Sequence, residues 1–120
     1  MAYYDQTNQQ LKYGEYSSGW TVTVVDTAGD VGKFCSHGYS PSGKPAIAYY
    51  DATDHDLKYA ERSNGVWKIY VVDSTGQVGS YCSLAFTSRG RPAISYYDET
   101  NTALKYAEAQ NTVYSAGPGL

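Results

Sequence analysis

Short runs of apolar and aromatic residues alternate with turn-forming residues along the whole chain. The clearest unit contains four such runs, at 33–39, 45–50, 57–61 and 66–72. Gly, Asn, Asp and Ser fill the connections, and Pro45 begins the second run, where a strand tolerates a missing amide donor. No stretch shows the 3.6-residue period of a helix. The pattern therefore predicts an all-β chain of short antiparallel strands.

The same unit recurs along the sequence. The phrase Tyr-Tyr-Asp ends at Asp5, Asp51 and Asp98, and each copy continues into Leu-Lys-Tyr. Successive copies lie 46 and 47 residues apart. This period is typical of propellers, solenoids and similar arrays, because one unit buries its apolar face only against a neighbour. Ile47 and Ala48 are apolar on opposite faces of one strand, as expected for a sheet packed between two others.

The order of strands and connections favours a β-propeller. Four antiparallel strands, followed by a longer crossing to the next unit, are the arrangement of one propeller blade. A β-helix would have shorter coils and weaker hairpin turns. We therefore expect a single repeat domain over 1–120. Its parts are strands two to four of a blade at 2–25, a complete blade at 33–73, strands one to three of a blade at 80–114, and a tail at 115–120.

The number of blades predicts assembly. About two and a half blades do not make a ring, and propellers close a ring to protect their sheet edges. We expect a homo-oligomer in which the first strand of one C-terminal partial blade completes the N-terminal partial blade of a neighbour. The last strand of that shared blade would come from the N-terminal segment, leaving residues from Tyr114 onwards as a displaced tail. The alternative, compatible with the first, is a natural or engineered piece of a longer propeller.

Composition narrows the classes of partner. The chain has 14 tyrosines, only 18% charged residues and a net charge of −3. A general nucleic-acid binder needs clustered lysine and arginine, and here the basic residues are dispersed. No run approaches the length of a membrane span, and no secretion signal is visible. We expect neither a nucleic-acid nor a membrane partner, and the compartment stays open.

Three phrases resemble the repeats of bacterial sialidase-like (BNR-type) propeller proteins. They are Pro-Ala-Ile-Ala-Tyr-Tyr-Asp at 45–51, Asp-Leu-Lys-Tyr-Ala-Glu at 56–61 and Val-Val-Asp-Ser-Thr-Gly-Gln-Val-Gly at 71–79. The turn at 63–65 is similar to an Asp-box, the structural turn between the third and fourth strands of such blades, with Asn64 in place of its aspartate. The resemblance extends to about Tyr114 and implies blade architecture without fixing an activity.

Sialidase activity in that superfamily requires three arginines for the substrate carboxylate, a tyrosine nucleophile and an acidic partner. The chain has Arg62, Arg89 and Arg91, which do not recur at one strand position, and two of them lie in a hairpin turn. The catalytic pattern is absent. We therefore predict that the protein is not an enzyme and has no catalytic residues.

A second resemblance is to small propeller lectins, whose two-blade chains trimerise. Their binding sites lie between blades and use a basic residue, an acidic residue and an outer-strand tryptophan. The same residue types occur here at Lys58, Glu61 and Trp67, and again at Lys12, Glu15 and Trp20. The resemblance implies a non-enzymatic module that binds carbohydrate weakly at several sites, which adds avidity. Tryptophan would stack on an apolar sugar face while the charged residues bind hydroxyls.

Two alternatives to this lectin hypothesis stay open. The repeated lysines and glutamates are also expected to pair across blades, where each surface pair adds little stability. The whole protein could then be a purely structural or protein-interaction propeller with no ligand.

We expect no metal ion and no cofactor. Asp51, Asp54 and Asp56 mimic a calcium loop, but the other copies lack the later carboxylates, so the first aspartate is expected to close its own turn. His37 and His55 are unrepeated, and the sequence gives neither an orienting partner for acid–base chemistry.

Cys35 and Cys82 occupy the same place in successive units. Equivalent positions in neighbouring blades lie too far apart for an easy disulfide bond. No further cysteine or histidine accompanies them at zinc-site spacing. We expect two small side chains packed in similar environments.

Overall fold

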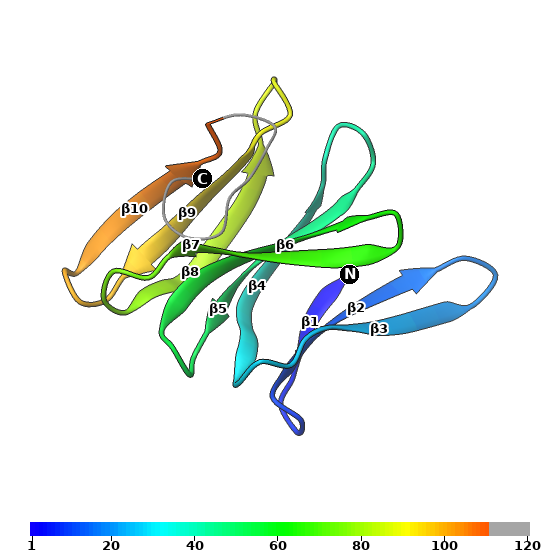
Figure 1. Cartoon of the computed structure of the whole chain (residues 1–120), viewed down its shortest axis with the longest axis horizontal. Coiled ribbons are helices and arrows are strands. Elements are labelled where there is room, and N and C mark those ends of the chain that lie inside the picture. The colour runs from blue at the N-terminus through cyan, green and yellow to red at the C-terminus, as the bar shows by residue number, and fades with distance from the viewer. Residues whose placement is uncertain (111–120) are drawn as a thin grey trace.

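The computed structural model describes residues 1–110, which form three antiparallel sheets and no helix (Figure 1). The first sheet contains β1 (Ala2–Asp5), β2 (Gln10–Tyr16) and β3 (Trp20–Asp26). The second contains β4 (Val31–Tyr39), β5 (Pro45–Asp51), β6 (Asp56–Ser63) and β7 (Val66–Asp73). The third contains β8 (Val78–Phe86), β9 (Pro92–Asp98) and β10 (Ala103–Glu108). The all-β prediction is confirmed, and the sheets are propeller blades.

The second sheet is a four-stranded meander in the order β4-β5-β6-β7. Each strand predicted for the complete unit lies within the corresponding observed strand, which extends a little further. The turn between β6 and β7 has positive φ at Asn64 (54°) and Gly65 (77°). Two consecutive residues with positive φ form the type I′ turn that matches the twist of a hairpin. The Asn-Gly pair in the Asp-box-like segment therefore has a local structural reason.

The first and third sheets contain three strands each among the described residues. Their orders are β1-β2-β3 and β10-β9-β8. In the second sheet β5 pairs with β4 on one side and with β6 on the other, whereas its repeat equivalent β1 pairs with β2 alone. β1 is thus an edge strand. The end of the partial blade expected at 80–114 and the tail expected at 115–120 lie, from residue 111 onwards, outside the described residues.

Two buried clusters hold the sheets together, one at each junction. Leu11 and Tyr13 of β2 anchor the first junction, and Leu57 and Tyr59 of β6 anchor the second. All four are at most 1% exposed. Each repeat packs the same apolar residues against the next sheet, so the core lies at these two junctions. We call the junction of the first and second sheets the first seam and that of the second and third sheets the second seam.

Glycine allows the sheets to approach closely at each seam. Gly32 of β4 and Gly79 of β8 have φ of 111° and 114°. A Cβ atom at Gly32 would lie 2.9 Å from the Cα atom of Leu11, and one at Gly79 would lie 2.8 Å from that of Leu57. Only glycine fits both the backbone angle and the contact.

A bulge near the start of each first strand brings two aromatic residues together. The register of β4 against β5 shifts around Phe34, and that of β8 against β9 shifts around Tyr81. Both residues have φ near 55°, at 55° and 53° respectively, and their ring centroids are 4.5 Å apart. Cys35 and Cys82 are free, and the Cys82 thiol donates a hydrogen bond to the Phe34 carbonyl at 3.0 Å. Burial raises the pKa of Cys82 to about 12, so this thiol stays protonated at neutral pH.

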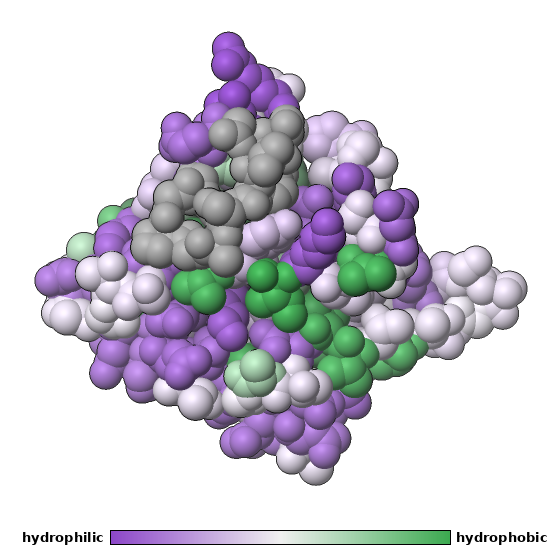
Figure 2. All heavy atoms as spheres, in the orientation of Figure 1, coloured by the Kyte–Doolittle hydropathy of each residue, from purple (hydrophilic) through white to green (hydrophobic). Residues whose placement is uncertain are grey.

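Apolar side chains are also exposed on the last strands of the first two sheets. Val22 and Val24 of β3 are 52% and 47% exposed, and Val66 and Ile69 of β7 are 59% and 38% exposed. Figure 2 shows apolar residues gathered over β7 and over part of β3. These strands form the outer ends of their sheets, so their side chains are only partly covered by neighbours.

Candidate functional site

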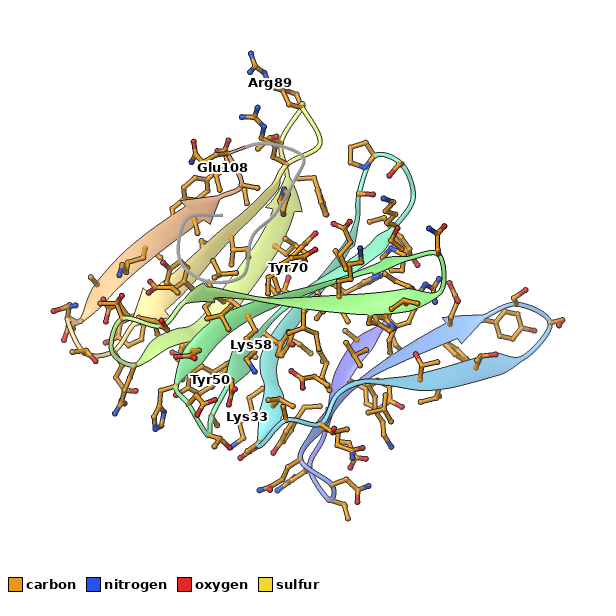
Figure 3. All side chains as sticks on the ribbon, in the orientation of Figure 1. Lys33, Tyr50, Lys58, Tyr70, Arg89 and Glu108 are labelled. Atoms are coloured by element: carbon orange, nitrogen blue, oxygen red, sulfur yellow. The ribbon has the colours of Figure 1, made fainter. Side chains whose placement is uncertain are left out.

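The repeated lysines form ion pairs with aspartates at the seams. Lys58 of β6 is 8% exposed and lies near the centre of the molecule in Figure 3. Its Nζ atom lies 2.8 Å from Asp51 Oδ2 and 3.8 Å from Asp26 Oδ2, at the end of β3. Burial alone would lower the pKa of Lys58, but the hydrogen bond with Asp51 and both carboxylate charges raise it. Lys58 therefore ties the second sheet to the first.

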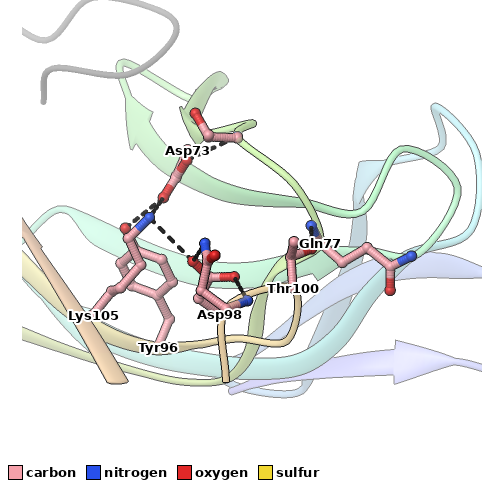
Figure 4. Close-up of polar contacts among 8 residues, drawn as sticks. Asp73, Gln77, Tyr96, Asp98, Thr100 and Lys105 are labelled. Atoms are coloured by element: carbon pink, nitrogen blue, oxygen red, sulfur yellow. Dashed lines mark hydrogen bonds and ion pairs between the residues drawn. The ribbon is translucent and has the colours of Figure 1, made fainter. Parts of the chain in front are cut away.

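The second seam repeats this arrangement (Figure 4). Lys105 Nζ lies 3.2 Å from Asp73 Oδ2 and 3.4 Å from Asp98 Oδ2. The hydroxyl of Tyr96 donates to Asp73 Oδ2 at 2.7 Å, as the hydroxyl of Tyr49 does to Asp26 Oδ2 at 2.7 Å. Lys12, the third repeated lysine, pairs with Asp5 at 2.7 Å. The lysine positions are thus engaged in ion pairs between and within sheets.

A different charged pair joins the first two sheets. The guanidinium of Arg62 in β6 donates two hydrogen bonds to the carboxylate of Glu15 in β2, at 3.2 and 3.1 Å. This two-pronged geometry fixes both side chains in one plane. Arg62 lowers the pKa of Glu15, and Glu15 in turn raises the pKa of Arg62, so both stay charged at neutral pH. Their side chains are 26% and 42% exposed, which leaves the pair accessible from solvent.

Aromatic rings surround this pair. The Arg62 Cζ atom lies 5.6 Å from the ring centroid of Tyr13 and 5.9 Å from that of Trp67 in β7. Trp67 is partly buried and meets Tyr13 edge to face, with ring centroids 5.3 Å apart. The hydroxyls of Tyr13 and Tyr39 are 3.1 Å apart. We call Glu15, Arg62 and Trp67, with the adjoining Tyr13, His37 and Tyr39, the first-seam site.

His37 of β4 adds a polar atom to this aromatic group. Its ring centroid lies 5.2 Å from that of Tyr13 and 4.7 Å from that of Tyr39. Burial lowers the pKa of His37, which favours the neutral ring at neutral pH. Its Nε2 atom is buried and has no hydrogen-bond partner among the described residues. The first-seam site therefore contains a hydrogen-bonded arginine–glutamate pair, aromatic walls and a ring nitrogen without a hydrogen-bond partner among the described residues.

The second seam differs at these positions. Leu84 and Phe86 stand where the first seam has His37 and Tyr39, and Ala109 stands where it has Arg62. Glu61, the equivalent of Glu15, accepts a hydrogen bond from the Tyr59 hydroxyl at 2.8 Å. Only the first of the two described seams combines arginine, glutamate and tryptophan.

Glu61 lies instead in a depression of about 250 Å³. Two basic residues, Lys44 and Arg89, also line it, together with Ser40, Pro41, Ser42 and Gly90. Arg89 projects from the tip of the β8–β9 hairpin in Figure 3. This depression is built from exposed hairpin tips and lacks an aromatic wall among its described lining residues.

Trp20 lies away from the first-seam site. It is 65% exposed, meets Tyr16 edge to face at 5.6 Å, and lines a mainly apolar hollow of about 310 Å³. A Cβ atom at Gly14 would lie 3.8 Å from the Trp20 ring. Because side chains alternate along a strand, Glu15 points to the opposite face of β2. Trp20 and Glu15 are therefore on different faces of the first sheet.

The structure thus brings together Glu15 and Trp67 from the six candidates, although the sequence assigned them to different units. Arg62 supplies the basic group, and Lys58 does not. Sequence reasoning missed Arg62 because repetition was the signal used, and this position holds tyrosine in the first unit and alanine in the third. Sugar binding by Lys58, Glu61, Lys12 and Trp20 stays a prediction.

Aspartates in the turns accept hydrogen bonds from backbone amides of the same turn. Asp51 Oδ1 accepts hydrogen bonds from the amides of Thr53 and Asp54 at 2.9 and 3.1 Å. Within residues 1–110 no group of three or more histidine, cysteine, aspartate or glutamate side chains is arranged to hold a metal ion. In the same range no helix is long and apolar enough to cross a membrane.

The fold is shared with a solved lectin. The structure of a fucose lectin from Kordia zhangzhouensis, in complex with methyl-fucoside, is similar to this chain with a TM-score of 0.56 and 18% sequence identity. The likeness covers 94% of this chain and 90% of that one. No protein-family model matches the chain, and neither does any curated protein sequence. At this identity the likeness shows the fold alone, which here is a succession of β-propeller blades.

Proposed function

We propose that the chain is a non-enzymatic carbohydrate-binding module and that the first-seam site is its binding site. The observation that carries the proposal is the two-pronged Arg62–Glu15 pair beside Trp67, at the junction of two blades. The fold shared with a fucose lectin supports it. The lysines, by contrast, are engaged in ion pairs that hold the sheets.

The chemistry of the site suits a neutral sugar with an apolar face. A carboxylate accepts hydrogen bonds from sugar hydroxyls and a guanidinium donates them, so the pair could bind two adjacent hydroxyls. Arg62 and Glu15 already fix each other, which reduces the ordering cost of binding. Trp67, Tyr13 and Tyr39 supply the aromatic surface on which an apolar sugar face would pack. A methyl fucoside combines both features and is the probe of choice.

One such site per described chain implies weak binding by a single copy. The second seam lacks the arginine and the polar ring groups, so it would not repeat the site. Multivalent binding would then come from several chains in one assembly, which increases avidity without any new contact.

The test is titration of the protein with methyl fucoside, followed by a glycan array. Arg62→Met removes the guanidinium group that pairs with Glu15, and Trp67→Ala removes the indole ring beside it. We expect each change to weaken binding at least about tenfold, the effect of losing one hydrogen bond to a charged group or one stacking contact. Tyr106→Ala is the matched control, because Tyr106 is an aromatic residue that is 61% exposed on β10 of the third sheet, away from the first-seam site.

A folded protein that binds no glycan on the array would contradict the proposal. So would binding that survives both Arg62→Met and Trp67→Ala. Far-ultraviolet circular dichroism of each variant separates loss of the site from loss of the fold.

We further propose that several copies assemble by sharing strands, as a ring of blades. In this arrangement residues 2–25, 33–73 and 80–114 act as a partial, a complete and a partial blade, with 115–120 as a tail. The free edge of β1 supports the idea, because exposed strand edges pair readily. We also propose a sialidase-like origin of the repeats, on the phrases that they share.

The alternative function is a structural or protein-interaction propeller without a sugar ligand. The exposed apolar ends of the molecule favour it: Leu104 and Tyr106 of β10 are 82% and 61% exposed. A stable assembly that ignores every glycan tested would select this alternative.

A further inference from the structure

We propose that the first sheet carries a preformed docking slot for one extended segment of another polypeptide. The slot is the free edge of β1 together with Tyr3, Gln6, Thr7 and Lys12. Its occupant has the pattern of a blade linker and first strand, Asp-x-x-Gly-x-Val-Gly-x-aromatic-Cys-Ser, as at 26–36 and 73–83. The inference deepens the assembly proposed above and does not depend on sugar binding.

The side chains that would hold the incoming segment can be identified from the first and second seams, where the linker is present. At each, the aspartate that begins the linker accepts a hydrogen bond from the repeated tyrosine: Asp26 from Tyr49 and Asp73 from Tyr96, both at 2.7 Å. The repeated lysine lies 3.8 Å from the first of these aspartates and 3.2 Å from the second. An incoming linker is thus recognised by one hydroxyl and one ammonium group.

The backbone part of the seams is repeated just as closely. The amide of Asp30 donates to Thr53 Oγ1 at 2.8 Å, and the Asp30 carbonyl accepts from the amide of Ala52 at 2.8 Å. In the second seam the amide of Gln77 donates to Thr100 Oγ1 at 2.8 Å, as Figure 4 shows. The Gln77 carbonyl accepts from the amide of Glu99 at 2.9 Å. Each linker is therefore held by the turn that follows the second strand of its blade.

The first sheet contains the same receiving groups. Tyr3, Gln6, Thr7 and Lys12 occupy the repeat positions of Tyr49, Ala52, Thr53 and Lys58. The two linkers of residues 1–110, at 26–32 and 73–79, are held by the turns of the second and third sheets, so neither of them occupies these groups. Lys12 pairs only with Asp5 of its own sheet among the described residues, at 2.7 Å. The first sheet is thus built to receive a linker that the described residues do not supply.

The occupant must also add a strand. In the complete sheet Val31 lies opposite Asp51 and Lys33 opposite Tyr50, and in the third sheet Val78 lies opposite Asp98. The same register would place the valine of the incoming segment opposite Asp5 of β1. Main-chain hydrogen bonds would supply affinity, and the aspartate would supply specificity through Lys12 and Tyr3.

The same segment would cover an exposed face on a second copy. Leu11 and Leu57 are fully buried beneath Gly32 and Gly79, but their equivalent Leu104 is 82% exposed. The glycine of a segment docked on β1 of one copy would be positioned to cover Leu104 of the next. One segment could therefore join two chains.

The experiment uses a fluorescein-labelled peptide with the sequence of residues 73–86, carrying Cys82→Ser to prevent oxidation. Binding to the full chain is followed by fluorescence anisotropy, and native mass spectrometry gives the mass of the complex. Hydrogen exchange locates the contact. We expect saturable binding, new protection of the β1 amides, and at least about tenfold weaker binding after Asp73→Asn in the peptide or Tyr3→Phe in the protein. A scrambled peptide is the control.

If copies of the chain already fill the slot, the peptide lowers the mass of the assembly, which also supports the proposal. Absence of both binding and mass change would overturn it. Equal affinity of the Asp73→Asn peptide, or protection of β9 and β10 in place of β1, would overturn it as well. Titration with methyl fucoside is read separately, because the first-seam site does not use β1.

Discussion

At the scale of single residues, a buried tyrosine–aspartate hydrogen bond anchors each seam. Tyr49 is fully buried, and Asp26 is 5% exposed. Burial and the nearby Asp26 carboxylate raise the pKa of Tyr49, so its hydroxyl stays protonated and donates. A buried carboxylate that loses such a donor keeps its desolvation cost.

Tyr49→Phe is therefore expected to lower the free energy of unfolding by about 1.5 to 3 kcal/mol. Urea unfolding at neutral pH measures it. The matched control is Tyr81→Phe, which removes a hydroxyl from a residue that is 71% exposed and should change stability by less than about 0.5 kcal/mol. Equal stability of the two variants would show that the Tyr49–Asp26 bond contributes nothing net.

The candidate site could be predicted from the sequence only in part, for a reason visible at individual residues. Glu15 and Trp67 have residue types that suit sugar binding, and both lie in the first-seam site. Lys58 has an equally suitable type, but its partner Asp26 lies 32 residues earlier, in the preceding unit, and is brought close only by the crossing between blades. Arg62 is unrepeated, so a search for repetition overlooked it.

At the scale of elements, the first strand of each blade depends on one glycine. Gly79→Ala would place a methyl group 2.8 Å from backbone of the preceding sheet, in addition to straining a φ of 114°. Gly43→Ala is the matched control, because Gly43 has a φ of 86° and nothing within 4 Å of its Cβ position. Strain alone costs about 1 to 3 kcal/mol.

We expect Gly79→Ala to be less stable than Gly43→Ala by at least about 1 kcal/mol, the cost of overpacking. Thermal or urea unfolding gives the difference. If the two variants lose the same stability, the close approach at the seam relaxes without cost.

The linkers between sheets make stability depend on pH. Burial alone would raise the pKa of Asp73, but hydrogen bonds from the Thr75 amide, Tyr96 and Lys105 outweigh it and lower the pKa below the ordinary 3.8. A lowered pKa in the folded state contributes stability above the unfolded value, and that contribution is lost as pH falls through the folded value. The loss is therefore expected below about pH 4.

Asp73→Asn tests this dependence. The variant should be less stable than the unmodified protein at pH 7, and the gap should narrow as the pH falls from about 4 to 2. Urea midpoints at a series of pH values measure both curves. A constant gap over this range would mean that Asp73 titrates alike in the folded and unfolded states.

The elements themselves were largely predictable, because each strand has β-branched or aromatic residues between strong turn signals. The bulges were not. Phe34 and Tyr81 look like ordinary strand residues, yet both have positive φ, and each bulge is stabilised by contact with the other first strand. Such contacts between neighbouring sheets leave no local mark in the sequence.

At the scale of the whole molecule, the outer face of the third sheet is more exposed than the equivalent faces of the first two sheets. Residues that a following sheet buries in the first two repeats are exposed in the third: Leu104 is 82% exposed, against 0% for Leu11 and Leu57. Burying one leucine side chain contributes about 1.5 to 3 kcal/mol. An end face of this kind favours contact with another polypeptide.

Leu104→Gln is expected to separate folding from assembly. Because the side chain is exposed, stability of the single chain should change by less than about 0.5 kcal/mol. If copies of the chain cover this face, self-association should weaken about tenfold or more, since the buried leucine contributes at least that much. Sedimentation velocity over a concentration series measures the shift.

Val66→Gln is the control, because Val66 is 59% exposed on β7 and away from the end face. An equal effect of both changes, or a protein that stays monomeric at every concentration, would show that Leu104 is not covered by another copy.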